Sequence, residues 1–179
     1  MGQYCGHMDE MNLAMLILRV GIGLTFAAHG YGKIFQGGRI PGTAGWFDSM
    51  GMKPGKLHAW MAALTEIGAG LLLALGFLTP LAAAGMVGVM VVAAWTVHRH
   101  NGFMIVREGW EYTFVLAVVA ASVATLGPME WSVDSALGID DDWDGYVGLA
   151  IGAGGGVLAG LTQLAVFYRP PKSDGAASQ

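Results

Sequence analysis

The chain is organised as five apolar stretches separated by short polar segments. The stretches cover residues 12–35, 57–78, 81–97, 111–127 and 145–168, and each carries few charged side chains. A helix that crosses the hydrocarbon core needs about 20 apolar residues, with a range of about 17–25. Because backbone polar groups cannot stay unpaired in hydrocarbon, each stretch is expected to be a transmembrane helix. The predicted fold class is therefore all-α, a polytopic membrane helix bundle.

The basic residues predict the orientation of this bundle. If all five stretches cross, every Lys and Arg except Arg19 lies on one side, namely Lys33, Arg39, Lys53, Lys56, Arg99, Arg107, Arg169 and Lys172. The opposite side holds the acidic residues Asp9, Glu10, Glu130, Asp134, Asp140, Asp141, Asp142 and Asp144. Basic residues in short loops mark the cytoplasmic face. We therefore expect a multi-pass protein of a bacterial-type plasma membrane, with the N-terminus outside and the C-terminus in the cytoplasm.

The segments between the spans complete the expected organisation. Residues 1–11 are expected to be an outer tail, residues 128–144 an acidic outer loop and residues 169–179 a cytoplasmic tail. Residues 1–11 lack the features of a cleavable signal peptide, so residues 12–35 are expected to be retained as a span. The loop that follows this span contains Trp46, Phe47 and Met50, which predict a short amphipathic piece at the cytoplasmic interface. Thr79-Pro80 predicts a tight outer hairpin.

Composition excludes several classes of protein. Of the 179 residues, 54% are hydrophobic and 12% charged, whereas soluble domains typically carry about 25% charged residues. No basic stripe with interleaved aromatic residues supports nucleic-acid binding. The only cysteine, Cys5, rules out an intramolecular disulfide, and thiol chemistry would need cysteines from a partner. The sequence has neither a phosphate-binding glycine loop nor a close pair of metal ligands, and no metal site is predicted.

Two charged residues lie deep within the apolar stretches. Arg19 is in the first stretch and Glu66 is in the second. A charge near the bilayer centre costs at least about 2.5–3.5 kcal/mol, which pairing with an opposite charge can offset. We therefore expect Arg19 and Glu66 to face each other in an intramembrane polar network. Such a network can be structural or functional.

Further polar residues are expected to gather toward the cytoplasmic end. His29 and Lys33 are four residues apart and share one helix face. The predicted inner-face pocket reaches toward Glu66 and contains His29, Lys33, His98, Asn101, Glu111 and Tyr112. Such a pocket can bind and protonate a quinone headgroup, or it can be a structural network that sets the helix register.

The fifth stretch has a glycine at every fourth position. Gly148, Gly152, Gly156 and Gly160 lie along one face of a helix with 3.6 residues per turn. Faces of small residues allow helix backbones to approach closely. Two interpretations remain open: packing within the same chain, or docking of a second copy or of another membrane protein.

Four blocks of residues resemble the DoxX/DoxD-type membrane proteins. The first block is Leu18-Arg19-Val20-Gly21 with Phe26, His29-Gly30 and Lys33, and the second runs from Ala63 to Gly70 and on to Leu75-Gly76 and Thr79-Pro80. The third is Thr96-Val97-His98 with Asn101-Gly102-Phe103, and the fourth is Glu111-Tyr112. The resemblance implies a four-helix membrane core over residues 12–127, to which residues 145–168 add a fifth, glycine-rich helix.

The resemblance also implies a role in membrane redox systems. Some members of the family resemble a subunit of thiosulfate:quinone oxidoreductase, and others are membrane partners of a sulfurtransferase and a superoxide dismutase. The first hypothesis is therefore a membrane subunit or anchor of an oxidative- or thiol-stress redox complex, without its own catalytic centre. The alternative is a quinone-reactive oxidoreductase subunit, and a third is a small transporter. The expected partners are the lipid bilayer, another subunit or a second copy, and quinone.

Overall fold

The protein folds into a set of long helices. A computed structural model describes residues 2–140 and 142–170, with side chains from residue 7 onward. The longest separate helices are α1 (Gly2–Phe35), α3 (Gly55–Leu75), α4 (Thr79–Ala93) and α5 (Glu111–Leu126). α7 (Gly145–Leu149), the π-helical segment η4 (Ala150–Gly155) and α8 (Gly156–Phe167) form one continuous helix. The described residues contain no β-strand, so the predicted all-α class is confirmed.

Short helices occupy the connections. α2 (Arg39–Ser49) buries Ile40 and Phe47, so the expected amphipathic piece is a helix. α4 continues into the π-helical segment η1 (Ala94–His98) and the 3-10 turn η2 (Arg99–Asn101). The remaining short elements are η3 (Ile105–Arg107) and α6 (Val133–Ala136). The connection between α3 and α4 is the expected tight hairpin: α3 ends at Gly76 in the left-handed conformation, and Pro80 lies in the first turn of α4.

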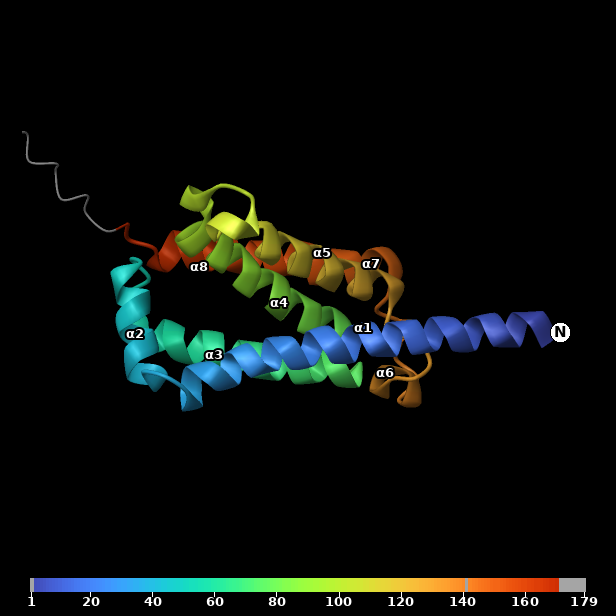
Figure 1. The fold of residues 1–179 in the computed structure, drawn as a ribbon. Helices are drawn as coiled ribbons and strands as arrows, with labels where there is room; N and C mark the ends of the chain where they lie inside the picture. The colour runs from blue at the N-terminus through green and yellow to red at the C-terminus, as the bar shows by residue number, and fades with distance from the viewer. Residues whose placement is uncertain (1, 141, 171–179) are drawn as a thin grey trace, which may run out of the picture.

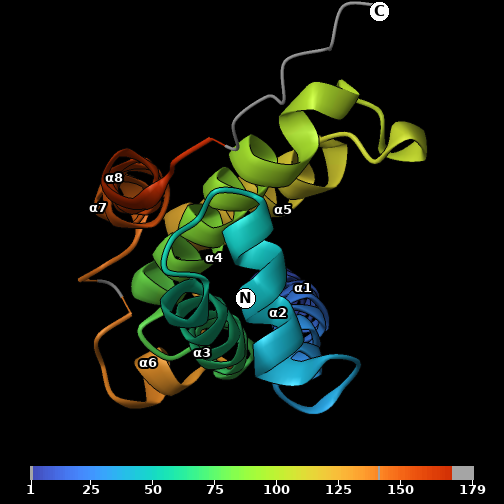
Figure 2. The same ribbon diagram turned by 90° about the vertical axis from the view of Figure 1, so that its left-hand side faces the viewer.

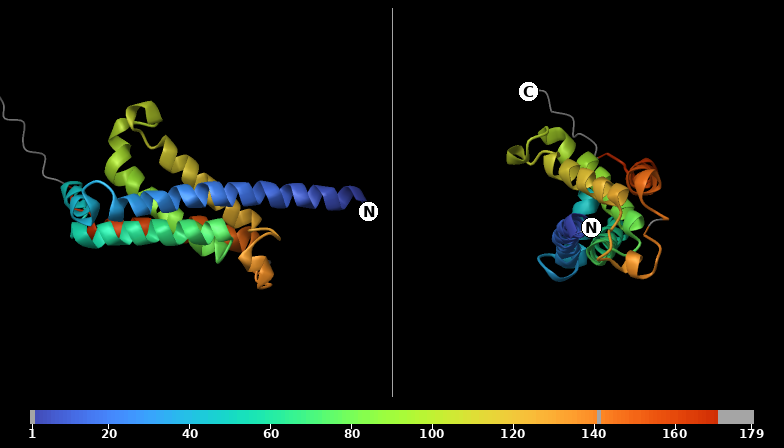
Figure 3. Two further views of the ribbon diagram at one scale, coloured as in Figure 1. Left: turned by 60° about the horizontal axis from the view of Figure 1, so that its bottom comes forward. Right: turned by 90° about the vertical axis from the view of Figure 1, so that its right-hand side faces the viewer.

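The bundle has two halves joined by α4. α1 packs antiparallel against α3, and α2 closes one end of this pair (Figures 1 and 2). α4 packs on α3 and also contacts α5 and the helix formed by α7, η4 and α8. α1 and α5 make few contacts with each other, and in Figure 3 they diverge toward the end that holds η2 and α2. This divergence is what leaves space inside the bundle.

Small residues bring the backbones of α1 and α3 close together. A Cβ atom added to Gly30 would lie 2.6 Å from the carbonyl oxygen of Ala63. A Cβ atom added to Gly70 would lie 2.6 Å from the amide nitrogen of Ala27. Since real Cβ atoms do not approach backbone this closely, only glycine fits at these positions. The contact sets the register of the two helices, in which Gly30 faces Ala63 and Glu66.

The glycine face of the fifth helix packs inside the same chain. Gly148, Gly152, Gly156 and Gly160 are all buried. A Cβ atom on Gly156 would lie 2.7 Å from the carbonyl oxygen of Ala84, and one on Gly160 would lie 2.9 Å from that of Gly88. Of the two interpretations that the sequence left open, the structure has packing within the same chain, because α4 and α5 cover this face.

Length and composition allow four helices to cross a membrane. They are His7–Phe35, Gly55–Leu75, Thr79–Asn101 and Gly145–Phe167. The fourth expected span, residues 111–127, corresponds to α5. This helix has 16 residues and is about 24 Å long at 1.5 Å per residue, somewhat less than the hydrocarbon thickness of about 30 Å. Many large apolar side chains point outward from these helices, as expected where lipid is the solvent. The protein is a multi-pass membrane protein.

The two ends of the bundle differ in charge. One end, which holds α2, η2 and η3, carries the basic residues 39, 53, 56, 99, 107 and 169. The other end, which holds α6 and the start of α7, carries the acidic residues 130, 134, 140, 142 and 144 (Figure 1). Asp141 and Lys172 lie outside the described residues. Residues 2–11, which were expected to be an outer tail, are the first part of α1, which begins at Gly2. This separation agrees with the expectation that most basic residues lie on one side of the membrane and the acidic loop on the other.

The packing of the glycine face predicts a difference between two glycines of one helix. Gly156→Val is expected to destabilise the protein by about 1–3 kcal/mol, because the new side chain overlaps backbone and Val87 of α4. Gly154→Val is the matched control, since nothing lies within 4 Å of a Cβ atom there. Thermal unfolding in detergent micelles should show a lower melting temperature for Gly156→Val alone. Equal effects of the two substitutions would contradict the assigned packing.

Candidate ligand-binding cavity

Glu66 forms an ion pair with Lys33 rather than with Arg19. The Lys33 Nζ lies 2.5 Å from Glu66 Oε2, and the Glu66 side chain is 6% exposed. The α1–α3 register places Glu66 opposite Gly30, one turn from Lys33. Arg19 lies instead beside Gly76, ten residues further along α3, which corresponds to about 15 Å. The predicted contact between Arg19 and Glu66 is therefore wrong.

Arg19 belongs to a separate polar cluster at the acidic end. Its Nη2 donates a hydrogen bond to the carbonyl oxygen of Trp131 at 2.6 Å, and the side chain is fully buried. Nearby, the Asp134 carboxylate accepts hydrogen bonds from the amides of Leu78 and Thr79 and from the Thr79 hydroxyl. These contacts hold the connection between α5 and α7 against the α3–α4 hairpin. Through its bond to Trp131, Arg19 links α1 to this connection.

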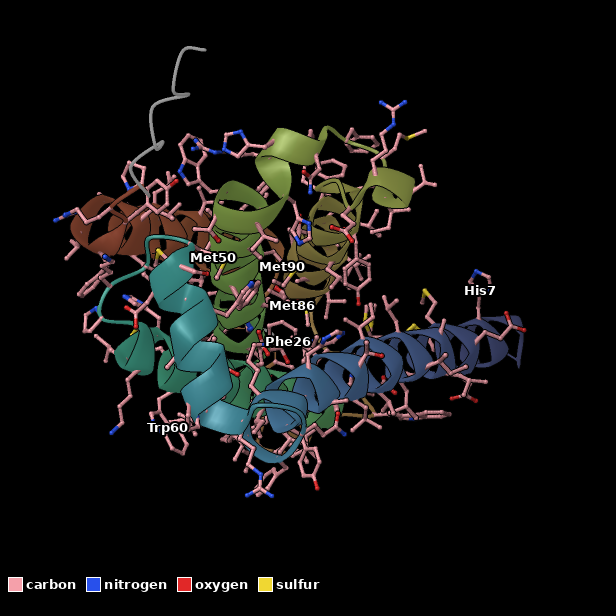
Figure 4. All side chains as sticks on the ribbon, turned by 60° about the vertical axis from the view of Figure 1, so that its left-hand side comes forward. His7, Phe26, Met50, Trp60, Met86 and Met90 are labelled. Atoms are coloured by element: carbon pink, nitrogen blue, oxygen red, sulfur yellow. The ribbon has the colours of Figure 1, made fainter. Side chains whose placement is uncertain are left out.

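A cavity of about 810 Å³ lies between the two halves of the bundle. Most of its wall is apolar and comes from α1, α3, α4, α5 and α8, with α2 contributing Trp46 and Phe47 at one end. In Figure 4, Phe26, Met50 and Met90 lie around this space, whereas His7 and Trp60 point away from it. Such a volume is typical of sites for small organic ligands, which run from about 300 to 1,000 Å³.

Several of the predicted pocket residues line this cavity. His29, Lys33 and Glu66 form part of the wall on the α1–α3 side, and His98 and Tyr112 form part of it on the α4–α5 side. His98 Nδ1 lies 2.7 Å from the carbonyl oxygen of Glu108. Because a carbonyl only accepts, Nδ1 carries the proton and Nε2 of neutral His98 is an acceptor. The structure thus brings together residues that the sequence grouped only by membrane depth.

Two residues predicted for the pocket lie outside the cavity wall. Asn101 donates a hydrogen bond to the carbonyl oxygen of Glu108 at 3.2 Å, and Glu111 accepts one from the amide of Ile105 at 2.7 Å. Both side chains therefore brace the turn between η2 and α5. Their polar groups bond to the backbone of the loop, in addition to the loop's own backbone hydrogen bonds.

The sequence prediction missed two polar residues of the wall. His58, in the first turns of α3, is fully buried, and Gln163 of α8 lies with its Nε2 3.0 Å from His58 Nδ1. Gln163 interrupts an otherwise apolar run in the fifth helix, which is a signal that could have been used. His58 lies so near the start of its helix that the sequence suggests an interfacial position.

The chemistry available in the cavity is hydrogen bonding and proton handling. It combines carboxylate, ammonium and imidazole groups with a large apolar surface. Among the described residues, no group of three or more His, Cys, Asp or Glu side chains is arranged to hold a metal ion. An uncharged organic molecule with a polar head and an apolar body matches these groups.

The fold and the cavity define a polytopic α-helical membrane protein. Residues 14–99, from within α1 to the first residue of η2, match the DoxX family model, and this matched region is called the DoxX domain. The resemblance expected from the sequence is confirmed over this range, whereas residues 101–112 and the fifth helix lie beyond it. No curated protein and no solved structure matches the chain.

The Lys33–Glu66 pair predicts a pattern of coupled stabilities. Glu66→Met is expected to destabilise the protein by about 3 kcal/mol, because it leaves the Lys33 ammonium without its partner. Lys33→Met combined with Glu66→Met should recover most of that loss. Arg19→Met combined with Glu66→Met should give additive losses, because the two residues are far apart. Unfolding in detergent measures these three variants and the single substitutions Lys33→Met and Arg19→Met, and coupling of Glu66 to Arg19 instead of Lys33 would refute the assigned pairing.

Proposed function

We propose that the protein is a membrane subunit that binds a quinone in its cavity. The observation that carries this proposal is the large apolar cavity, into whose wall the Lys33–Glu66 pair, His29, His98 and Tyr112 are built. A quinone combines a ring whose oxygens accept hydrogen bonds with an apolar body that dissolves in the bilayer. The sparse contact between α1 and α5 supports entry of such a ligand from the lipid.

In this proposal the chain contributes binding and proton handling to a redox complex. Reduction of a quinone to a quinol takes two electrons and two protons. In this role Glu66 and His29, which line the cavity, exchange protons with the quinone. The electrons come from a partner redox subunit in the oxidative- or thiol-stress complexes that the family resemblance suggests. An anchor without a ligand site has less support, because the glycine face that favoured docking is covered within the chain.

Binding of decylubiquinone tests this proposal. The wild-type protein in detergent is expected to bind this probe saturably, with quenching of Trp46 fluorescence because Trp46 lines the cavity. Trp46→Phe should remove most of the quenching. Glu66→Gln should weaken binding about 5- to 10-fold, since it disrupts a charge-assisted hydrogen bond in the wall.

Glu10→Gln is the matched control for this measurement. Glu10 lies on the exposed outer part of α1, far from the cavity, and its substitution should leave the affinity unchanged. Quenching that never saturates, or that persists equally in Trp46→Phe, would argue against a quinone site in the cavity.

We also propose that the acidic end faces outward and the basic end faces the cytoplasm. The single cysteine, Cys5, makes this orientation measurable without engineering. A membrane-impermeant maleimide is expected to label Cys5 in intact cells, because Cys5 precedes the span His7–Phe35 and lies on the outer side in this orientation. A cysteine introduced at Ser49, in a Cys5→Ser background, should be labelled only after lysis. The reverse pattern would contradict the orientation.

A further inference from the structure

One polar side chain in the cavity wall is buried with part of its hydrogen-bonding capacity unused. His58 is fully buried and lies between Phe47 of α2 and Phe167 of α8, with ring centroids 6.1 and 4.9 Å away. Within the part of the chain that the structure describes, Nε2 of His58 has no hydrogen-bond partner. Among the described residues, the other buried side-chain atoms in this condition belong to Arg19, at the opposite end of the bundle. Buried polar groups are normally paired, so an unpaired one in a cavity wall points to a ligand.

Gln163 determines what His58 can offer. The Gln163 amide nitrogen donates toward His58 Nδ1 at 3.0 Å, so Nδ1 acts as the acceptor. In a neutral imidazole the proton then lies on Nε2, which becomes a donor. His98, across the cavity, has the opposite arrangement, because its Nδ1 faces a carbonyl oxygen. Of the imidazoles in the cavity wall, His58 therefore has a donor at Nε2 and His98 has an acceptor there.

We propose that His58 Nε2–H donates a hydrogen bond to a carbonyl oxygen of the molecule bound in the cavity. This inference rests on the proposed quinone site and adds a second polar attachment point to the Lys33–Glu66 pair. His58 and Glu66 are eight residues apart on α3, about 12 Å along its axis. A quinone has two opposite carbonyl oxygens, so His58 Nε2–H can serve one of them and the Lys33 ammonium, which is the donor of the ion pair, can serve the other.

The same geometry gives the fifth helix a part in ligand recognition. Gln163 belongs to α8, which lies outside residues 14–99 of the DoxX domain. It does not contact the ligand oxygen in this arrangement but holds the donor tautomer and ring orientation of His58. Gln163 is therefore a positioning residue, and His58 is the residue that touches the ligand.

Decylubiquinone binding to the full chain in detergent tests this inference with two readouts. The first is affinity from Trp46 quenching, and the second is the carbonyl stretch of bound quinone in infrared difference spectra. His58→Phe keeps a ring but removes the donor, and it should weaken binding about 3- to 10-fold. It should also shift one carbonyl stretch to higher wavenumber, because a hydrogen bond to a carbonyl lowers that frequency. A purely structural role for His58 would not produce this shift.

Two further variants complete the design. Gln163→Met keeps the side-chain length and removes the contact to His58 Nδ1. It should also shift the quinone carbonyl stretch to higher wavenumber, with a smaller loss of affinity than His58→Phe. If His58→Phe does not fold, this variant decides the outcome. His7→Phe is the matched control, since His7 points away from the cavity on the outer part of α1 (Figure 4), and it should change neither readout.

The outcomes separate this inference from the proposed function. If the wild-type protein binds and Glu66→Gln weakens binding, but His58→Phe and Gln163→Met keep wild-type affinity and spectrum, the role of His58 is overturned and the quinone site stands. If the wild-type protein shows no saturable binding, both proposals fail. Loss of affinity together with the carbonyl shift supports both.

Discussion

The close contact between α1 and α3 is the constraint on which the rest of the structure depends. Gly23 and Gly30 on one helix and Gly70 on the other allow backbone atoms to meet, so the pair has a single register. That register brings Lys33 to Glu66 and carries Arg19 to Gly76. A different register would leave a carboxylate without a partner inside a low-dielectric medium, which is costly. Small residues thus select the ion pair as well as the packing.

The polar groups of the bundle divide into two clusters with different tasks. At the acidic end, Arg19 and Asp134 satisfy backbone groups of the outer connection and of the α3–α4 hairpin. Toward the basic end, Lys33, Glu66 and His98 lie on the wall of a cavity of about 810 Å³. The second cluster is therefore the one that borders enough space for a ligand.

The helix formed by α7, η4 and α8 completes the bundle on the far side of α4. Its glycines fit against Ala84, Gly88 and Val91, which lets α8 approach closely enough for Gln163 to reach His58. The cavity wall is thus built from the DoxX domain together with a helix beyond it. A chain that kept only the four-helix core would lack Gln163 and Phe167 at this place.

The sequence by itself determined the membrane class, the helix positions and the separation of basic from acidic ends. These follow from the requirement that hydrocarbon imposes on every backbone group, which is local and depends little on partners. It also identified His29, Lys33, Glu66, His98 and Tyr112 as residues of one region. Only the tertiary structure decided that Glu66 pairs with Lys33, that the glycine face is internal and that His58 meets Gln163. Those choices depend on the register and rotation of packed helices, and a repeat of small residues does not specify which neighbour covers it.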